Sequence, residues 1–297
     1  MFQARERAQW FSASVAVAVF ATFVAMAAPI PTLSDLRSPA YRGKFLPVPP
    51  IRQSRNFTCG AAAVQSVLAY FGEDFREAQL ERVLATDPYH GTSVEKIVAF
   101  WKAMGDAQAQ RALRALSGKA ELESVTAPDS PSVENPPVRF NFRLFGKREW
   151  HDAIGPPAPD CPRPNVTSAP IASAWKADEG WPGVKRAADR GWPVIVALQA
   201  GALSPADYVG VRWDSGHYAV VVGYDADRVY FMDPMVVGRY VQLSHAAFRS
   251  RWYDYDGPLS PTTGERCPGG HRLYRFGIAV GIDAPSRYRW SQVLPME

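Results

Sequence analysis

The amino-acid sequence predicts an α+β fold, in which helices come first along the chain and antiparallel strands follow. Apolar side chains recur at helical spacing in three segments, at about 59–71, 76–85 and 93–104. After residue 190, short apolar runs rich in valine are separated by turn residues, which is typical of strands. Helices grouped before strands, rather than alternating with them, indicate an α+β order.

The first of these helices is predicted to begin at Cys59. Thr58 is a residue type that favours the N-cap position, and Gly72 is one that ends helices at C′. Cys59 then falls in the first turn, where unpaired N–H groups and the positive end of the helix dipole favour a thiolate. The small Gly60 that follows allows another part of the chain to approach closely. The apolar face of this helix consists of Val64, Val67, Leu68 and Phe71.

Similar patterns predict the remaining elements. Thr92 and Glu95 have the spacing of a capping box before the third helix, and Gly105 is its predicted stop. Residues 138–145 alternate between apolar and polar side chains, which predicts a half-buried strand. Further strands are predicted at 193–199, 217–224, 228–232, 238–243 and 272–282.

A predicted β-hairpin in the second half carries a histidine and an aspartate. Residues 217–224 form its first strand, residues 225–228 the turn and residues 229–232 the returning strand. His217 begins the first strand and Asp233 ends the second, so their side chains are expected in the same neighbourhood. A carboxylate beside an imidazole fixes its tautomer and orientation. The alternative is a solvated histidine and an aspartate that only starts the Asp-Pro turn.

Four residues together supply the parts of thiol-dependent acyl chemistry. Cys59 is the candidate nucleophile, His217 the base that takes its proton, and Asp233 the group that orients the base. Gln53 lies six residues before Cys59, and its amide is the candidate donor to a developing oxyanion, beside the N–H of Cys59. For Cys59 alone, a buried structural cysteine is the alternative, and Gln53 gains meaning only from the other three residues.

With these residues in place, the sequence resembles the C39 and C39-like cysteine peptidases. The motif Q-x5-C-G before a helix, the run G-H-Y-A-V-V-V-G-Y, and D-P with its aspartate sixteen residues after the histidine are similar to those of that family. The resemblance implies a papain-like cysteine peptidase fold, with an N-terminal helical half and a C-terminal antiparallel sheet. It implies Cys59 as nucleophile, His217 as base, Asp233 as orienter and Gln53 as oxyanion donor. The implied partner is a peptide or protein substrate.

The stretch from about 117 to 180 has no obvious counterpart in compact members of this family. It is predicted to be an insertion in a peptidase domain that spans residues 51–297. Three other functions remain open. One is acyl transfer to an amine, as in the phytochelatin-synthase relatives that share a Q-x5-C-G start. Another is a catalytically inactive peptide-binding module, and the third is an interaction protein that uses the insertion as its surface.

Residues 1–28 have the features of a signal peptide or an N-terminal membrane anchor. Two arginines precede an apolar stretch at about 13–28, and Ala25-Met26-Ala27 fits an A-x-A cleavage site. Cleavage after Ala27 would release the chain, whereas an uncleaved apolar run of about 18 residues could span a bilayer. Residues 29–50 are rich in proline and predict an extended linker. Both alternatives place the domain outside the cytoplasm, where it is secreted, periplasmic or membrane-anchored.

Composition narrows the classes of function that remain, and the two other cysteines raise the question of a disulfide. The chain of 297 residues is 47% hydrophobic and 21% charged, which suits a globular core. Its formal charge of +4 is mild and its arginines are dispersed, so nucleic-acid binding has little support. The other histidines lack metal-ligand spacing, and neither a metal nor a cofactor is expected. Cys161 and Cys267 lie in Pro-rich loops and are either a disulfide pair or two unpaired thiols.

Overall fold

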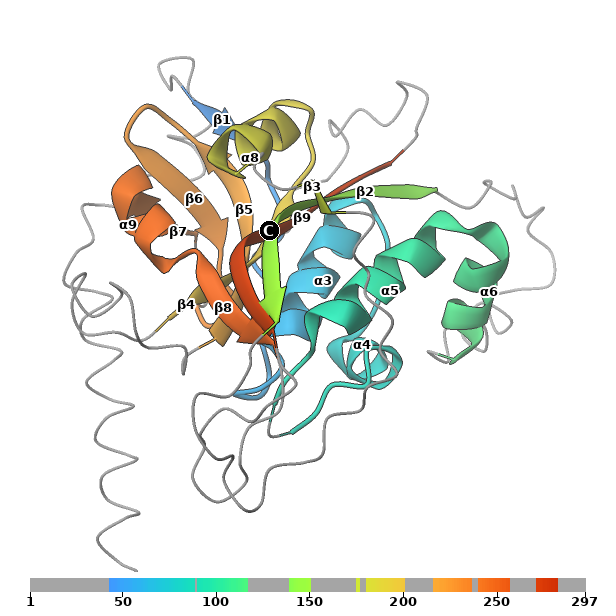
Figure 1. Ribbon diagram of the computed structural model, residues 1–297. Helices are drawn as coiled ribbons and strands as arrows, with labels where there is room; N and C mark the ends of the chain where they lie inside the picture. Colours follow the sequence, from blue (N-terminus) through green and yellow to red (C-terminus); the bar gives the residue numbers. More distant parts are fainter. Residues whose placement is uncertain are drawn as a thin grey trace, which may run out of the picture.

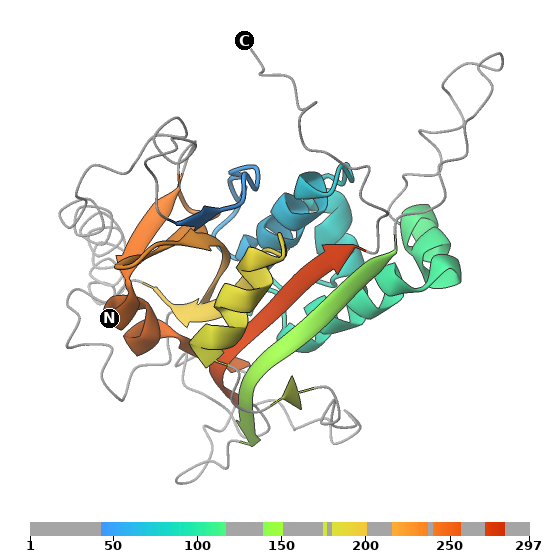
Figure 2. The same ribbon diagram turned by 90° about the horizontal axis from the view of Figure 1, so that it is seen from above.

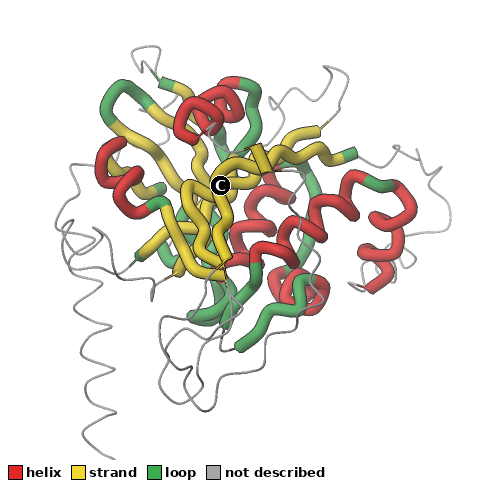
Figure 3. The backbone as a smooth tube through the Cα atoms, in the orientation of Figure 1, coloured by secondary structure: helices red, strands yellow, loops and turns green. Residues whose placement is uncertain are grey.

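The computed structural model describes residues 43–88, 90–116, 139–150, 175–176, 180–200, 216–236, 240–256 and 271–282. These residues show the predicted α+β order, with a helical half followed by a largely antiparallel sheet. The helical half gathers on one side of the strands (Figure 1, Figure 3). Its helices are α3 (Cys59–Tyr70), α4 (Glu77–Val83), α5 (Val94–Gly105) and α6 (Ala107–Leu116), and the later helices are α8 (Gly180–Asp189) and α9 (His245–Arg251).

Within the described residues, nine strands form one sheet. Its order is β3-β2-β9-β4-β5-β6-β7, with β1 added to β5 and β8 added to β9. The pairings are antiparallel except that of β2 with β3, which is parallel. The strands are β1 (Lys44–Phe45), β2 (Phe140–Trp150), β3 (Trp175–Lys176), β4 (Val194–Gln199), β5 (Gly216–Tyr224), β6 (Arg228–Met232), β7 (Val241–Ser244), β8 (Tyr253–Asp256) and β9 (His271–Ile282).

Strand β4 occupies the centre of the sheet, between β5 and β9. Two short strands, β1 and β8, pair with the parts of β5 and β9 that extend beyond β4. On one side β4 pairs with the first part of β5, and β1 pairs with the last part at Gly223 and Tyr224. On the other side β8 pairs with the beginning of β9, ahead of the residues that pair with β4. The central strands therefore have hydrogen-bonding partners on both edges.

Both faces of the central sheet are buried, because alternate residues of its strands belong to different cores. In β4, Ile195 and Ala197 belong to the core shared with α3 and α5, whereas Val194 and Val196 belong to the core shared with α8 and α9. Figure 1 shows α8 above the long β2–β9 pair and α3 and α5 below it, and Figure 2 shows the same pair from above with α8 beside it. The side chains of a strand alternate between its two faces. Burial of both faces explains why these strands appear in the sequence as continuous apolar runs.

Helix α3 begins at Cys59, as predicted, and ends with the predicted glycine. Gly72 has a φ of +81°, a conformation that glycine adopts without a steric penalty. The N–H groups of Gly72 and Glu73 donate to the carbonyl oxygens of Ala69 (3.0 Å) and Leu68 (2.9 Å). These two bonds form a Schellman motif, so the predicted helix stop is confirmed.

The predicted hairpin is also present, as strands β5 and β6. Its turn is closed by the carboxylate of Asp225, which accepts hydrogen bonds from the N–H groups of Asp227 (2.8 Å) and Arg228 (2.7 Å). The register pairs Val220 with Met232 and shifts between Val221 and Gly223, where β5 has a bulge. The pairing places the beginning of β5 beside the chain that leaves β6.

The N-cap of α5 differs from the prediction. Ser93, rather than Thr92, caps the helix, because its hydroxyl accepts a hydrogen bond from the N–H of Lys96 at 3.4 Å. The Thr92 hydroxyl instead lies 2.7 Å from that of Thr86. Both residue types make good caps, and only the tertiary contact with Thr86 decides between them.

The linker prediction is wrong for residues 43–50, which belong to the folded domain. Strand β1 pairs with β5, and the N–H of Leu46 donates to the carbonyl oxygen of Val222 at 2.6 Å. Leu46 and Val48 are buried in the core with α3. Prolines exclude a helix in a tether and in an extended edge segment alike, so composition could not separate the two.

Part of the predicted insertion at about 117–180 is integral to the sheet. Strand β2 pairs with β9 over its whole length, and Phe140 and Leu144 are buried in the core. The other residues of this stretch lie outside the described ranges, apart from residues 139, 175–176 and 180.

Residues 1–28, the predicted signal peptide or anchor, also lie outside the described ranges, as do Cys161 and Cys267. Among the helices that the structure describes, none combines the length and apolar character needed to cross a membrane.

The close contact between β1 and β5 yields a stability prediction at Gly223. A Cβ at this position would overlap the carbonyl oxygen of Lys44 and lie 3.0 Å from the Cα of Phe45. Gly223→Ala is therefore expected to lower the free energy of unfolding by about 1–3 kcal/mol, measured by denaturant titration. Lys44→Ala is the control, because it keeps the carbonyl and should change stability by less than about 0.5 kcal/mol. Equal effects of the two substitutions would contradict the β1–β5 contact.

Candidate active site

Cys59 is the first residue of α3 and is buried, with 9% of its surface exposed. Thr58 occupies the predicted N-cap position, but its side chain does not cap the helix. The Thr58 hydroxyl accepts a hydrogen bond from the N–H of Arg55 (3.2 Å) and donates to the carbonyl oxygen of Arg55 (3.1 Å). The usual capping bond is therefore missing from the first turn, so this hydroxyl does not satisfy the N–H groups at the positive end of α3 near Cys59.

His217 and Asp233 form a buried hydrogen-bonded pair. Nε2 of His217 lies 2.8 Å from Oδ1 of Asp233, and His217 is only 4% exposed. Oδ1 of Asp233 also accepts a hydrogen bond from the N–H of Met235 at 2.9 Å. The hairpin explains the pairing, because His217 lies at the beginning of β5 and Asp233 directly follows β6.

Burial and charge shift both pKa values of this pair. Burial by itself would lower the pKa of His217, but the charge of Asp233, the hydrogen bond to it and the neighbouring Cys59 raise that pKa well above 6.5. Burial by itself would raise the pKa of Asp233, but the charge and hydrogen bond of His217, with the N–H of Met235, lower it below 3.8. Both shifts favour the charged forms of the two groups, an imidazolium and a carboxylate.

Cys59 lies close enough to the His217 ring for its thiol to contribute to the raised pKa of that ring. Because Asp233 occupies Nε2, the ring nitrogen left for the thiol is Nδ1. Residues from α3, β5 and the turn after β6 thus come together in the order thiol, imidazole, carboxylate. Chemically, this order can deliver a proton to and from sulfur.

Gln53 lies beside the Asp233 turn and is joined to it through its main chain. The N–H of Gln53 donates to the carbonyl oxygen of Pro234 at 2.9 Å. Its side-chain Nε2 donates to the carbonyl oxygen of Arg55 at 2.7 Å, while its buried Oε1 has no hydrogen-bond partner among the described residues. An amide nitrogen has two N–H groups, so one remains for a ligand.

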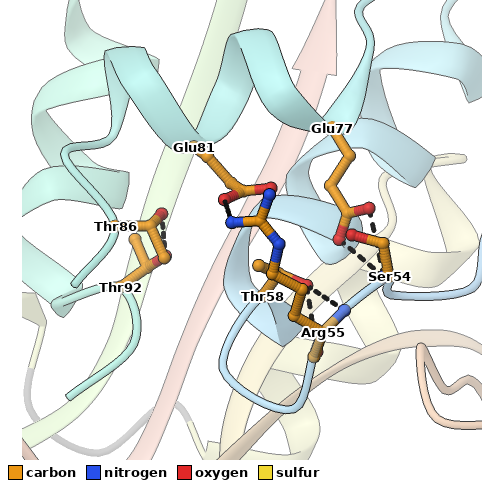
Figure 4. A network of polar contacts seen from close by, with 7 residues as sticks. All are labelled: Ser54, Arg55, Thr58, Glu77, Glu81, Thr86 and Thr92. Carbon is orange, nitrogen blue, oxygen red and sulfur yellow. Dashed lines mark hydrogen bonds and ion pairs between the residues drawn. The ribbon is translucent and has the colours of Figure 1, made fainter. Parts of the chain in front are cut away.

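Helix α4 holds the loop that carries Gln53 (Figure 4). Both carboxylate oxygens of Glu77 accept a hydrogen bond from the N–H of Ser54, at 3.0 and 3.1 Å. One turn later, Glu81 forms an ion pair with Arg55 at 3.1 Å. Residues spaced i, i+4 project from the same face of a helix, so one face of α4 fixes the loop directly after Gln53.

Gly60, predicted to allow a close approach, meets Thr92 and Tyr218. A Cβ at Gly60 would lie 2.8 Å from Cβ of Thr92 and 3.2 Å from Cδ2 of Tyr218. Figure 4 shows Thr92 beside Thr86, whose hydroxyl it contacts at 2.7 Å. The loop before α5 and the strand β5 therefore both touch the residue that follows Cys59.

Sequence reasoning missed the supporting residues Glu77, Glu81 and Thr92. The signal available for the two glutamates is their i, i+4 spacing, which is ordinary on an exposed helix face. For Thr92 the sequence indicates only a helix cap. The contacts of all three residues depend on segments distant in sequence, which local patterns do not reveal.

Within the described ranges, no group of three or more His, Cys, Asp or Glu side chains could hold a metal ion. Nδ1 of His90 lies 3.0 Å from Oδ1 of Asp87, and Nε2 of His245 lies 3.1 Å from the carbonyl oxygen of Arg228. At the site itself, Cys59, His217 and Asp233 offer a thiol, an imidazole and a carboxylate.

Comparison with known proteins bears on the family that this chain resembles and on its fold. Residues 150–258 match the model of the Peptidase_C39 like family, which confirms the resemblance to C39-like peptidases in this part of the chain. The matched segment contains His217 and Asp233, whereas Gln53 and Cys59 precede it. No curated protein matches the sequence.

Two solved structures are similar to the chain at low identity. The peptidase domain of Streptococcus ComA, a bi-functional ABC transporter involved in a quorum sensing pathway, is 16% identical with a TM-score of 0.37, and the match covers 78% of this chain and 95% of that domain. A protein from Bacillus anthracis described as a C39-like peptidase is 12% identical with a TM-score of 0.38, covering 77% and 96%. At these values neither structure carries information about this chain's substrate.

The pKa shifts of the buried pair predict how its contribution to stability depends on pH. Because folding lowers the pKa of Asp233, its carboxylate stabilises the fold above pH 3.8, and this stabilisation is lost as the pH falls through the folded-state pKa. Because folding raises the pKa of His217, its imidazolium stabilises the fold below pH 6.5, and this stabilisation is lost as the pH rises through the folded-state pKa. In a Cys59→Ala background, the free energy of unfolding lost in Asp233→Asn should therefore be largest between about pH 4 and 6.5 and should shrink at alkaline pH.

The matched control is Asp225→Asn. Burial would raise the pKa of Asp225, but hydrogen bonds from Tyr230 and from the N–H groups of Asp227 and Arg228 lower it. No histidine contributes to that shift, so its stability difference should stay constant from about pH 5 to 9. The same flat profile for Asp233→Asn would show that the carboxylate does not hold His217 in its protonated form.

Proposed function

We propose that this chain is a cysteine peptidase, which cleaves a peptide or amide bond through Cys59, His217 and Asp233. One observation carries the proposal: a buried imidazole is held at Nε2 by a carboxylate at 2.8 Å, and the thiol at the beginning of α3 is near enough to help raise the pKa of that imidazole. A buried charged pair is costly to maintain unless each group is satisfied. Structural stability alone does not require such a pair, whereas proton transfer to and from a thiol would explain its presence.

In the proposed reaction, the thiolate of Cys59 attacks the carbonyl carbon of the substrate and forms a carbon–sulfur bond. The carbon–nitrogen bond then breaks as His217 gives its proton to the leaving amine. Water then attacks the thioester and loses a proton to His217. The carbon–sulfur bond breaks, which releases the carboxylic acid and restores the thiolate of Cys59 beside the protonated His217. Asp233 keeps the imidazole oriented through both halves of the reaction.

The oxyanion that forms in each half is assigned to two donors. One is the N–H of Cys59, in the first turn of α3, where the helix dipole favours negative charge. The other is the side-chain amide of Gln53, which has one N–H left after its bond to Arg55. The bond from the Gln53 main chain to Pro234 supports this role, because it fixes Gln53 relative to the Asp233 turn.

Kinetic measurements test these roles on a library of unstructured peptides analysed by mass spectrometry. Cys59→Ala is expected to abolish cleavage, and Asp233→Asn to lower kcat about 10²- to 10⁴-fold in a folded protein. Gln53→Ala should lower kcat about 10²-fold with little change in KM, because its amide acts on the transition state. Gln65→Ala, further along α3, is the control and should leave kcat unchanged.

Three outcomes would contradict this proposal. Cleavage that persists in Cys59→Ala would rule out a thioester at that residue. Products joined to an added amine, without hydrolysis, would identify an acyl transferase instead. Peptide binding without turnover, unchanged by Cys59→Ser, would identify a binding module.

The proposed site of action is outside the cytoplasm, with a peptide or protein as the substrate. The arginines, apolar stretch and A-x-A site within residues 1–28 support this placement. N-terminal sequencing of the protein recovered from cell fractions is expected to find either a mature end at Ala28 or an intact Met1 in the membrane fraction. Recovery of the intact chain from the soluble cytoplasmic fraction would contradict both forms of the proposal.

A further inference from the structure

A second buried carboxylate, that of Asp254 in β8, has no part in the reaction described above. Asp254 is only 5% exposed. Its Oδ1 accepts hydrogen bonds from Nε2 of Gln199 at 2.8 Å and from the N–H of Tyr255 at 2.8 Å. Gln199 is itself 2% exposed. A buried polar group is stable only when it is hydrogen-bonded, and these two bonds hold the Asp254 side chain in place.

The carboxylate of Asp254 lies directly against Gly216, the residue before His217. A Cβ at Gly216 would lie 2.5 Å from Oδ1, 2.8 Å from Oδ2 and 3.0 Å from Cγ of Asp254. Glycine is therefore required at this position because the carboxylate fills the space of a side chain. The contact joins β8 to the beginning of β5.

Gln199 completes this contact from the neighbouring strand. It ends β4 and is the register partner of Gly216, while Leu198 is the partner of His217. One carboxylate thus contacts both members of the last residue pair of the β4–β5 ladder. The ends of strands fray more readily than their centres, and His217 lies one residue from this end.

We propose that Asp254 and Gln199 form a buried polar anchor that positions His217 for its contact with the Cys59 thiol. Asp254 acts as a positioning residue through its bonds to Gln199 and to the Tyr255 main chain. The groups that act on the charge of His217 are Asp233 and Cys59. The anchor therefore works through the placement of the β5 backbone.

The inference rests on the proposed function, and alkylation of Cys59 tests it without a substrate. The rate of iodoacetamide modification at Cys59 is measured on the full-length protein, with the site located by peptide mass spectrometry. At about pH 6, only a thiol paired with an imidazolium reacts quickly. At about pH 9, an unassisted thiol is also ionised.

Asp254→Ala is expected to slow alkylation at about pH 6 by roughly tenfold or more, because a small displacement of His217 weakens its contact with sulfur. At about pH 9 its rate should stay within roughly twofold of the parent. Asp254→Asn keeps an acceptor at Oδ1 for both Gln199 and Tyr255 and should therefore behave as the parent. Val184→Ala, in the core beneath α8, is the control for lost stability without a change in the alkylation profile.

The outcomes separate this inference from the function on which it rests. If the parent itself reacts slowly at about pH 6, the proposed thiol–imidazole pair fails. If the parent reacts quickly and Asp254→Ala does so equally, only the anchor is overturned. An equal loss in Asp254→Asn would show that the bonds at Oδ1 do not position His217 and would also overturn it. Should Asp254→Ala not fold, Gln199→Ala removes the same bond from the other side, and an unchanged profile there would overturn the anchor.

Discussion

The buried pair of His217 and Asp233 is the constraint on which the rest of this structure depends. Two opposite charges below the surface are tolerated only when their remaining hydrogen-bonding groups are satisfied. Here the turn after β6 supplies the N–H of Met235, and the beginning of α3 brings Cys59 near the imidazole. Because the segments are far apart in sequence, the pair is satisfied only when the helical half has packed against the sheet.

The contacts that join the two halves therefore lie around the same few residues. Gly60 lets Thr92 and Tyr218 approach the first turn of α3 closely, and the main chain of Gln53 is bonded to Pro234. A single larger side chain at Gly60 would separate the helix from the strand that carries His217. Packing and proposed chemistry thus impose the same requirement on this part of the chain.

The supporting residues act on the main chain rather than on the reactive side chains. Glu77 holds the N–H of Ser54 beside Gln53, and Asp254 packs on Gly216 beside His217. The amide of Gln53 consequently keeps an N–H for a substrate, and the imidazole of His217 keeps Nδ1 for the thiol. A site held in this way needs precise placement of its backbone, which the β4–β5 ladder and α4 provide.

The sequence by itself determined the elements whose signals are local. Helical spacing and a terminal glycine defined α3, and apolar runs around a turn defined the β5–β6 hairpin, which together place Cys59, His217 and Asp233 at element ends. Only the tertiary structure decided that residues 43–50 join the sheet, that Ser93 caps α5 and that side chains of α4 bind the loop after Gln53. These features arise from contacts between distant segments, whose hydrogen bonds and close approaches form only after burial has brought the segments together. Periodicity within one segment does not indicate which other segment will pack against it.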